Sequence, residues 1–358
     1  MSVIRRIANG VVVPIPADVT TPEHLCTGVL TEGFQDVPES IVWRGTERWT
    51  EPPRRPEPGE IGERRGDHMF AGLLYGHFGH FLVESTARLW ALETLGSKLD
   101  GIVFVPKAQV RQQQVLARYQ VFLDLLGIDL PVENLTEPAR YDAIHVPRQG
   151  FGMFGMIEGI PEYRHFMRSR LDRRITANGP QKLYVSRSEL PHMRGGLLGE
   201  KLIEQHLIAE GYHIYHPQKH SFHDQLAAYK AADFIVSPDG SPLHMAALVA
   251  RPGTRIAVVA RRPNVALQFV FQFRAFCDIE PVIVNALRCH WIPVAEVEPN
   301  RLSHGELDVP AVGRQLAQGG LIRAGTDWPE MTADQRDGLM TALTAQQRTR
   351  FRRYRHPT

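Results

Sequence analysis

The sequence has few cysteines, no long apolar run and no excess of charge of either sign. Its three cysteines, Cys26, Cys277 and Cys289, form no CxxC pair, which argues against a disulfide framework or zinc ribbon and favours a reducing compartment. The sequence contains no run of about eighteen consecutive apolar residues, and its N-terminus lacks a cleavage signal. We therefore expect neither a membrane span nor a signal peptide. The 41 Lys+Arg residues are nearly balanced by 39 Asp+Glu residues, so the net charge gives no reason to expect that the whole surface binds nucleic acid. We expect a cytoplasmic protein.

What remains is the composition of a globular protein with a real core, 43% hydrophobic and 22% charged. A chain of 358 residues fits two domains of typical size. The break Asn178-Gly179-Pro180 is the strongest in the middle of the chain. We therefore place an N-terminal α/β domain at 1–177, a second α/β domain at 178–292 and a helical extension with a basic tail at 293–358.

The second domain shows a regular alternation of apolar strands and helices. The expected strands are 182–186, 212–215, 234–236, 256–260 and 282–284, and the expected helices are 197–210, 222–231, 241–250 and 264–276. Such alternation is typical of a doubly wound parallel sheet, whose ligands bind at the carboxyl ends of the strands. The stretch Ala232–Arg261 is strand, glycine loop, helix and strand, the unit that binds phosphates in open α/β sheets.

Two groups of residues in this domain suit an anionic ligand. In Asp239-Gly240-Ser241 the glycine admits a phosphate and the serine can cap the helix, with His244 one turn on; a turn glycine and a capping serine are the plain alternative. Arg187 and Arg194 follow the first strand and could clamp a diphosphate, although arginines at strand ends often only face solvent. A serine nucleophile is disfavoured, because Pro242 follows Ser241 and G-x-S-x-G is absent.

A third group lies in the first domain, in a helix expected from His80 to Leu95. His80, Glu84 and Arg88 fall at i, i+4 and i+8 on one face of that helix. His80 at the helix start can accept a proton, and Glu84 can orient it or act as the base itself. A charge ladder on a solvated face is the alternative. No HExxH, GxGxxG or P-loop motif is present, so we expect no metal and no cofactor.

Together these segments resemble glycosyltransferase family 61, especially its bacterial members of capsular and exopolysaccharide synthesis. The matching segments are HFLVESTARLW at His80, LYVSRSEL at Leu183, RGGLLGE at Arg194 and ADFIVSPDGSPLHMAALV at Ala232. The resemblance implies a GT-B fold, with two Rossmann-like domains facing across a cleft. It implies an inverting, metal-independent transfer from a nucleotide sugar, with the donor on the second domain and the acceptor on the first.

Roles for individual residues follow from the resemblance and the groups above. His80 or Glu84 is the catalytic base. The donor-binding residues are Ser186, Arg187, Arg194, Glu200, Asp239, Gly240, Ser241 and His244. This chain departs from the family where Asp239 replaces a common histidine, His244 a common asparagine, and Gly199-Glu200 an Asn-Glu pair. A UDP-sugar is the favoured donor, and a glycan or lipid-linked glycan the expected acceptor.

Two alternatives stay open. A catalytically silent nucleotide-sugar sensor or scaffold would keep Arg187 and Gly240 and use His80 only for packing. The tail Arg348–His356, with five arginines around Phe351 and Tyr354, is a basic patch that is either merely solvated or a docking site. If it docks, we favour peripheral contact with an anionic membrane, at the inner membrane face, over nucleic acid.

Overall fold

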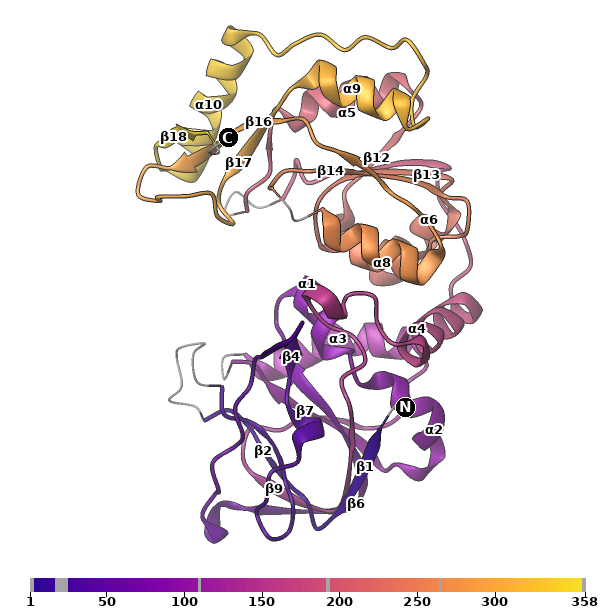
Figure 1. Cartoon of the computed structure of the whole chain (residues 1–358), viewed down its shortest axis with the longest axis vertical. Helices are drawn as coiled ribbons and strands as arrows, with labels where there is room; N and C mark the ends of the chain where they lie inside the picture. The colour runs from indigo at the N-terminus through magenta and orange to yellow at the C-terminus, as the bar shows by residue number, and fades with distance from the viewer. Residues whose placement is uncertain (1–2, 17–24, 109–110, 191–193, 264–265, 356–358) are drawn as a thin grey trace. The chain divides into compact units, whose positions relative to one another are not determined.

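The computed structural model describes residues 3–16, 25–108, 111–190, 194–263 and 266–355. They form two compact units, Met1–Arg174 and Ile175–Thr358, shown in Figure 1 in indigo to magenta and in rose to yellow. Each unit has its own sheet and its own apolar core. No helix within the described ranges is both long and apolar enough to cross a membrane.

Unit 1 is built on a mixed seven-stranded sheet in the order β3-β2-β9-β6-β7-β8, with β1 also paired to β9. Its strands are β1 Ile4–Ala8, β2 Val11–Val13, β3 Gly28–Leu30, β6 Gly62–Leu74, β7 Gly101–Pro106, β8 Val132–Asn134 and β9 Ala139–Pro147. The pairs among β9, β6, β7 and β8 are parallel, whereas β1, β2 and β3 pair antiparallel. The all-apolar β7 is buried throughout, as expected of a strand covered on both faces.

Two longer helices, α3 Gln112–Leu125 and α4 Pro161–Arg174, complete unit 1 with a small hairpin, β4 Trp43–Arg44 and β5 Glu47–Arg48. The continuous helix predicted from His80 to Leu95 is wrong. The chain forms α1 Phe78–His80, a π-helical turn η4 Phe81–Ser85, a 3₁₀ turn η5 Leu89–Ala91 and α2 Leu92–Leu95.

Buried contacts explain this interruption. Thr86 donates its amide to the Phe81 carbonyl and its hydroxyl to the Leu82 carbonyl, which widens the turn. Arg88, fully buried, donates to the carbonyls of four residues elsewhere in unit 1, which are Pro147, Glu39, Ser40 and Ile41. Of the three residues predicted on one helix face, His80, Glu84 and Arg88, the third therefore lies in the core instead.

Unit 2 contains the predicted parallel sheet, with all five strands confirmed. They are β10 Lys182–Val185, β12 His213–Tyr215, β13 Phe234–Pro238, β14 Arg255–Val259 and β15 Val282–Val284, in the order β12-β10-β13-β14-β15. Every neighbouring pair is parallel. Because the order reverses direction at β10 and β13, the carboxyl ends of these two strands are the usual place for a ligand.

Helices cover both faces of this sheet. In Figure 1, α5 Glu200–Ala209 and α9 Val309–Gln318 lie on one face, and α6 Phe222–Ala231 and α8 Leu267–Cys277 lie on the other, with α7 Ser241–Val249 packed between α6 and α8. Ser221 caps α6 by accepting the Asp224 amide. The helix predicted to begin at Leu197 begins instead at Glu200, because Leu197–Leu198 form strand β11. The predicted helix start at Asn264 lies outside the described residues.

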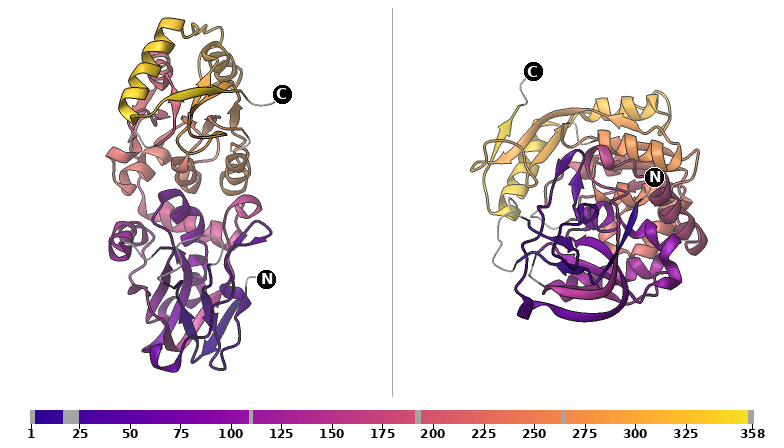
Figure 2. Two further views of the ribbon diagram at one scale, coloured as in Figure 1. Left: turned by 90° about the vertical axis from the view of Figure 1, so that its left-hand side faces the viewer. Right: turned by 60° about the horizontal axis from the view of Figure 1, so that its bottom comes forward.

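The C-terminal extension is not only helical. A second sheet in the order β11-β17-β16-β18 joins β16 Leu287–Pro293, β17 His304–Leu307 and β18 Phe351–Tyr354. A capping box formed by Thr332 and Gln335 opens α10 Ala333–Gln347. Helix α10 lies beside β18 in Figure 1 and the left view of Figure 2, and Leu343 packs with Phe351. The middle of the basic tail, Phe351–Tyr354, is thus an edge strand, and His356 lies outside the described residues.

Candidate functional site

In unit 1, the short turns of 78–85 bring His80 and Glu84 into direct contact. The Nδ1 atom of His80 lies 2.6 Å from Oε2 of Glu84. The Tyr75 ring stacks on the His80 ring, with centroids 5.3 Å apart, and the Tyr75 hydroxyl donates to Oε1 of Glu84 at 3.3 Å. The predicted pair is therefore held together, with an aromatic wall on one side of the imidazole.

The carboxylate of Glu84 has a second partner that the sequence did not reveal. Arg44 of β4 donates Nε to Oε1 at 2.7 Å and Nη2 to Oε2 at 3.0 Å, a bidentate ion pair. The Trp49 ring covers the Arg44 guanidinium at 3.5 Å. Forty residues of chain separate Arg44 from Glu84, and no periodicity links the two, so only tertiary structure pairs them.

These contacts fix the charge state of Glu84. Burial works to raise the pKa of its carboxyl, but the hydrogen bonds from His80 and then Arg44 outweigh burial and hold that pKa below its ordinary 4.5. Nearby, burial and then the Arg44 charge lower the pKa of Lys107. Glu84 is thus a carboxylate at neutral pH, and its side chain has no exposed surface.

This environment separates the roles of the two predicted catalytic residues. An ionised Glu84 accepts the Nδ1 proton of His80, which selects the tautomer whose Nε2 carries a lone pair. The His80 side chain is 36% exposed, and Nε2 has no hydrogen-bond partner among the described residues. Chemically, His80 can take a proton from an outside group, whereas Glu84 can only orient and stabilise the ring.

In unit 2, Ser186 and Arg187 leave the carboxyl end of β10 and meet the start of α5. The Glu200 carboxylate accepts the Arg187 amide at 2.8 Å, the Tyr184 hydroxyl at 3.1 Å and the Ser186 hydroxyl at 3.4 Å. Ser186 also donates to Glu204 at 2.6 Å. Burial raises the pKa of Glu200 to about 7, against these hydrogen bonds. Glu200 therefore shapes the turn that carries Arg187 rather than facing outward.

Asp239, the residue hardest to reconcile with an anionic ligand, holds backbone and cations in place. It is fully buried, and its carboxylate accepts the Arg261 amide at 2.7 Å. Its other oxygen lies 3.1 Å from Nη2 of Arg261 and 3.2 Å from Nη2 of Arg262. No sequence pattern marks these two arginines as site residues, since they simply follow an apolar strand.

The two arginine groups converge at the loop Arg194–Gly196. The Gly195 carbonyl accepts Nη2 of Arg187 at 3.1 Å and Nη1 of Arg261 at 3.4 Å. A Cβ on Gly240 would lie 3.1 Å from Nη1 of Arg187, so glycine lets the loop before α7 approach this guanidinium. Arg194 is exposed at the start of the loop, and its charge is among those that lower the pKa of Arg187 after burial.

Positive charge exceeds negative charge in this cluster, which we call the arginine cluster: Arg187, Arg261 and Arg262. One aspartate and the buried Glu200, whose pKa is raised by burial, oppose three guanidinium groups. The Nε atoms of Arg187 and Arg262 are buried and have no hydrogen-bond partner among the described residues. Buried donors of this kind call for an acceptor, and an anion supplies one.

The remaining predicted residues lie at the start of α7. Gly240 is its N-cap residue, so the expectation that Ser241 can cap the helix is not met. The Ser241 hydroxyl makes no hydrogen bond with described residues. Of the first three residues of this nine-residue helix, Pro242 has no amide and Leu243 donates its amide to the Gly240 carbonyl, so only the Ser241 amide is left open at this end. His244 is buried against α8, with Nδ1 2.6 Å from Oε1 of Gln272. It packs the helix rather than lining the cluster.

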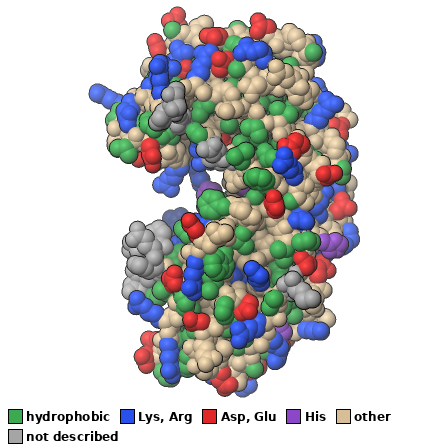
Figure 3. All heavy atoms as spheres, viewed as in Figure 1, with side chains coloured by type: hydrophobic (Ala, Val, Ile, Leu, Met, Phe, Trp, Pro, Cys, Tyr) green, Lys and Arg blue, Asp and Glu red, His purple; other side chains and the backbone are tan. Residues whose placement is uncertain are grey.

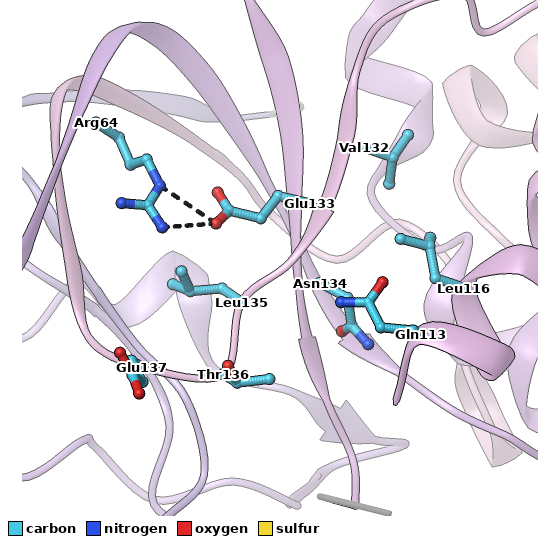
Figure 4. A pocket seen from close by; sticks show the side chains of 9 residues that line it. All are labelled: Arg64, Gln113, Leu116, Val132, Glu133, Asn134, Leu135, Thr136 and Glu137. Atoms are coloured by element: carbon cyan, nitrogen blue, oxygen red, sulfur yellow. Dashed lines mark hydrogen bonds and ion pairs between the residues drawn. The ribbon is translucent and has the colours of Figure 1, made fainter. Parts of the chain in front are cut away.

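A pocket of about 350 Å³ lies elsewhere in unit 1, around β8 and the start of α3. Figure 4 shows the Arg64–Glu133 ion pair on one side of it and Gln113 beside Asn134 on the other. None of its lining residues belongs to the His80–Glu84 pair, and the pocket contributes nothing to that chemistry. Across the described ranges, no three His, Cys, Asp or Glu side chains gather as a metal site would require.

Comparison with protein families places this chain beside a known family. The family model Glycosyltransferase 61 matches residues 78–257. A search of curated proteins finds no match. The matched region contains His80, Glu84, Arg187 and Gly240 and ends before Arg261.

Proposed function

The chain belongs to glycosyltransferase family 61, and from this premise we propose that it transfers a sugar, with inversion and without a metal, from a nucleotide-sugar donor to a glycan or lipid-linked glycan. The observation that carries the proposal is the arginine cluster at the switch point of the parallel sheet. Three guanidinium groups around one aspartate suit the diphosphate of a nucleotide sugar better than any neutral ligand.

Leaving-group stabilisation is the task we assign to unit 2. When the bond from the anomeric carbon to the diphosphate oxygen breaks, negative charge grows on that oxygen. Arg187, Arg262 and the open Ser241 amide of α7 would hold this charge, each contributing about 3–4 kcal/mol at most. In this scheme the guanidinium groups neutralise the diphosphate, which is the task of a divalent cation in metal-dependent transferases.

Proton removal is the task we assign to unit 1. The acceptor hydroxyl forms its bond to the anomeric carbon from the opposite side and passes its proton to Nε2 of His80. Glu84 stabilises the imidazolium that results, and Arg44 keeps Glu84 ionised. Such general-base assistance is typically worth about 10²–10⁴ in rate. Of the two residues predicted as the base, the geometry favours His80.

The test uses purified full-length protein with UDP-, GDP- and CMP-linked sugars, of which a UDP-sugar is our first choice. Binding is followed by thermal shift and nucleotide release by chromatography. Arg187→Ala should weaken donor binding, and His80→Ala should leave binding intact but lower release about 10²–10⁴-fold. His165→Ala, an exposed histidine of the same unit, is the matched control.

Other outcomes would contradict the proposal. Donor binding without any nucleotide release, unchanged by His80→Ala, would favour the silent scaffold. Absence of binding to every nucleotide sugar would remove the donor site. A role in bacterial capsule-type polysaccharide synthesis and the GT-B fold rest on the resemblance, and the cytoplasmic location rests on the sequence composition. All three stay predictions.

For a lipid-linked acceptor we propose that the edge strand β18 contacts an anionic bilayer. Its Arg352 donates to the carbonyl of Val297, whose side chain is 81% exposed, and the Arg350 carbonyl binds the amide of Val294, which is also exposed. Lys and Arg side chains protrude in this region of Figure 3. Exposed valines beside arginines suit a negatively charged bilayer surface.

Liposome flotation tests this contact. Wild-type protein should float with vesicles containing phosphatidylserine and not with phosphatidylcholine alone, and Val297→Asp with Arg352→Ala should abolish flotation. Equal flotation of wild type and variant would reject the docking surface while leaving the transferase proposal intact.

A further inference from the structure

The arginine cluster has a neighbour in the C-terminal extension, at the start of β17. The Gly195 amide donates to the Arg301 carbonyl at 2.7 Å, and the Gly305 amide donates to the Gly196 carbonyl at 3.0 Å. Two hydrogen bonds thus fasten β17 to the glycine loop whose Gly195 carbonyl accepts Arg187 and Arg261. His304, between these contacts, lies next to the cluster.

The His304 ring is neutral in this setting. Burial, and then the charges of Arg261 and Arg187, lower its pKa to about 4. A Cβ on Gly196 would lie 3.7 Å from Nδ1 of His304, so the glycine leaves that edge of the ring uncovered. An uncharged imidazole beside the guanidinium groups of Arg261 and Arg187 adds hydrogen-bonding capacity without a further positive charge.

Gln347, the last residue of α10, determines which ring nitrogen can donate. Its Nε2 lies 2.9 Å from Nε2 of His304. With the amide nitrogen of Gln347 placed toward the ring, that nitrogen donates, the ring Nε2 accepts, and the ring proton is on Nδ1. This Nδ1–H has no acceptor among the described residues. The ring therefore presents a free donor at the edge that Gly196 leaves open.

We propose that His304 donates its Nδ1–H to a phosphate oxygen of the diphosphate and that Gln347 is the positioning residue that selects this tautomer. The inference rests on the proposed donor site and extends it. Both residues lie outside the matched region 78–257, so the C-terminal extension completes a site that the family-matched region begins. A hydrogen bond to a charged oxygen is typically worth about ten- to a hundredfold in affinity.

The test is calorimetric titration of the full chain with inorganic pyrophosphate and with UDP at pH 7. His304→Ala should weaken pyrophosphate binding about tenfold. His304→Asn places an amide donor where Nδ1–H stands and should restore most of the affinity. His304→Gln places its amide where Nε2 stands and should not. His213→Ala, an exposed histidine on β12, should bind like the wild type.

Gln347 is tested separately, because a structural role would give a different result. Gln347→Leu should reduce pyrophosphate affinity by a factor of about three and shift the ¹⁵N resonances of His304 toward a mixture of tautomers. The exposed neighbour variant Gln346→Leu should change neither. A Gln347→Leu protein that keeps both affinity and tautomer would overturn the positioning role.

The possible outcomes distinguish a failure of the His304 role from a failure of the proposed donor site. Wild-type affinity in His304→Ala, with affinity lost in Arg187→Ala, overturns the role of His304 and keeps the donor site. No binding of pyrophosphate or UDP by the wild type removes the donor site itself. Equal losses in His304→Asn and His304→Gln would show that the ring only packs, so the inference would be wrong. If His304→Ala does not fold, the comparison of the Asn and Gln variants decides alone.

Discussion

At the scale of single residues, the unit 1 site depends on one buried carboxylate. Glu84 keeps its negative charge only because His80 and Arg44 outweigh the effect of burial. Replacing it with glutamine preserves size but removes the charge that stabilises an imidazolium. We expect Glu84→Gln to lower kcat about 10²–10⁴-fold with little change in donor affinity, measured by nucleotide release. An unchanged kcat would contradict the orienting role.

The Glu84 carboxylate should also make the stability of the protein depend on pH, with stability lost toward acid pH. Because folding lowers the Glu84 pKa below 4.5, its contribution to stability is present above pH 4.5 and disappears as pH falls through the folded-state value. The free energy of unfolding should therefore differ between wild type and Glu84→Gln at pH 7 and converge toward pH 3, as followed by denaturant titration. The exposed Glu47→Gln should show no such convergence.

A buried carboxylate in unit 2, that of Asp239, allows a prediction about stability. Its carboxylate is buried between Arg261 and Arg262, and removing one partner of a buried ion pair typically costs about 3–5 kcal/mol. Asp239→Asn should lower the melting temperature, and pyrophosphate should restore part of the loss by neutralising the same arginines. Asp233→Asn breaks only an exposed pair with Arg251 and should cost within about 1 kcal/mol. Equal losses in the two variants would contradict a cluster held by Asp239.

Residue pairs show what the sequence can and cannot reveal. His80 and Glu84 were predicted because they lie four positions apart, a spacing that brings side chains together in helices and survives the π-helical turn. Arg44 and Arg261 were missed because their partners are distant in the chain or lie across a strand, where no period applies. Asp239 was predicted among the donor-binding residues, to hold a sugar hydroxyl or a backbone amide, and its carboxylate does accept the Arg261 amide. Its complete burial was not predicted, because tertiary structure decides it.

At the scale of elements, the strands that are buried on both faces are the ones that the sequence predicts best. The five strands of the parallel sheet were predicted because continuous apolar runs between glycine and proline breaks have few alternatives. The region His80–Leu95 has helical spacing too, yet it breaks because Arg88 turns inward to bind four carbonyls. Strands β11 and β18 are short edge pieces stabilised by partners far away in sequence, so local pattern did not indicate them.

One glycine ties two elements together and can be tested. A Cβ on Gly195 would collide with the carbonyl oxygens of Ser303 and Arg301, so Gly195→Ala must push β17 away from the arginine loop. We expect this variant to lose pyrophosphate affinity about tenfold or more, measured by calorimetry, since Gly195 positions Arg187. Gly338→Ala, on α10 with open space around it, should instead stabilise the protein by about 0.5–1 kcal/mol and bind normally.

At the scale of the whole molecule, the proposed mechanism divides the chemistry between two units that each have a core. The matched region 78–257 crosses the boundary after Arg174, so it includes the predicted base from unit 1 and the first part of the proposed anion site from unit 2. Chains built from separate cores commonly unfold in more than one step. Ligand binding should then stabilise only the unit that holds the ligand.

Tryptophan positions allow a direct test of this division. Unit 1 contains Trp43, Trp49 and Trp90, and unit 2 contains Trp291 and Trp328. In a Trp291→Phe, Trp328→Phe protein, fluorescence reports unit 1 alone, while circular dichroism reports both units. Pyrophosphate at a hundred times its Kd should leave the fluorescence transition unchanged and stabilise a second dichroism transition by about 2.7 kcal/mol. Stabilisation of the fluorescence transition would mean that unit 1 also binds the anion or that the units unfold together, and either result would contradict a donor site held by unit 2 alone.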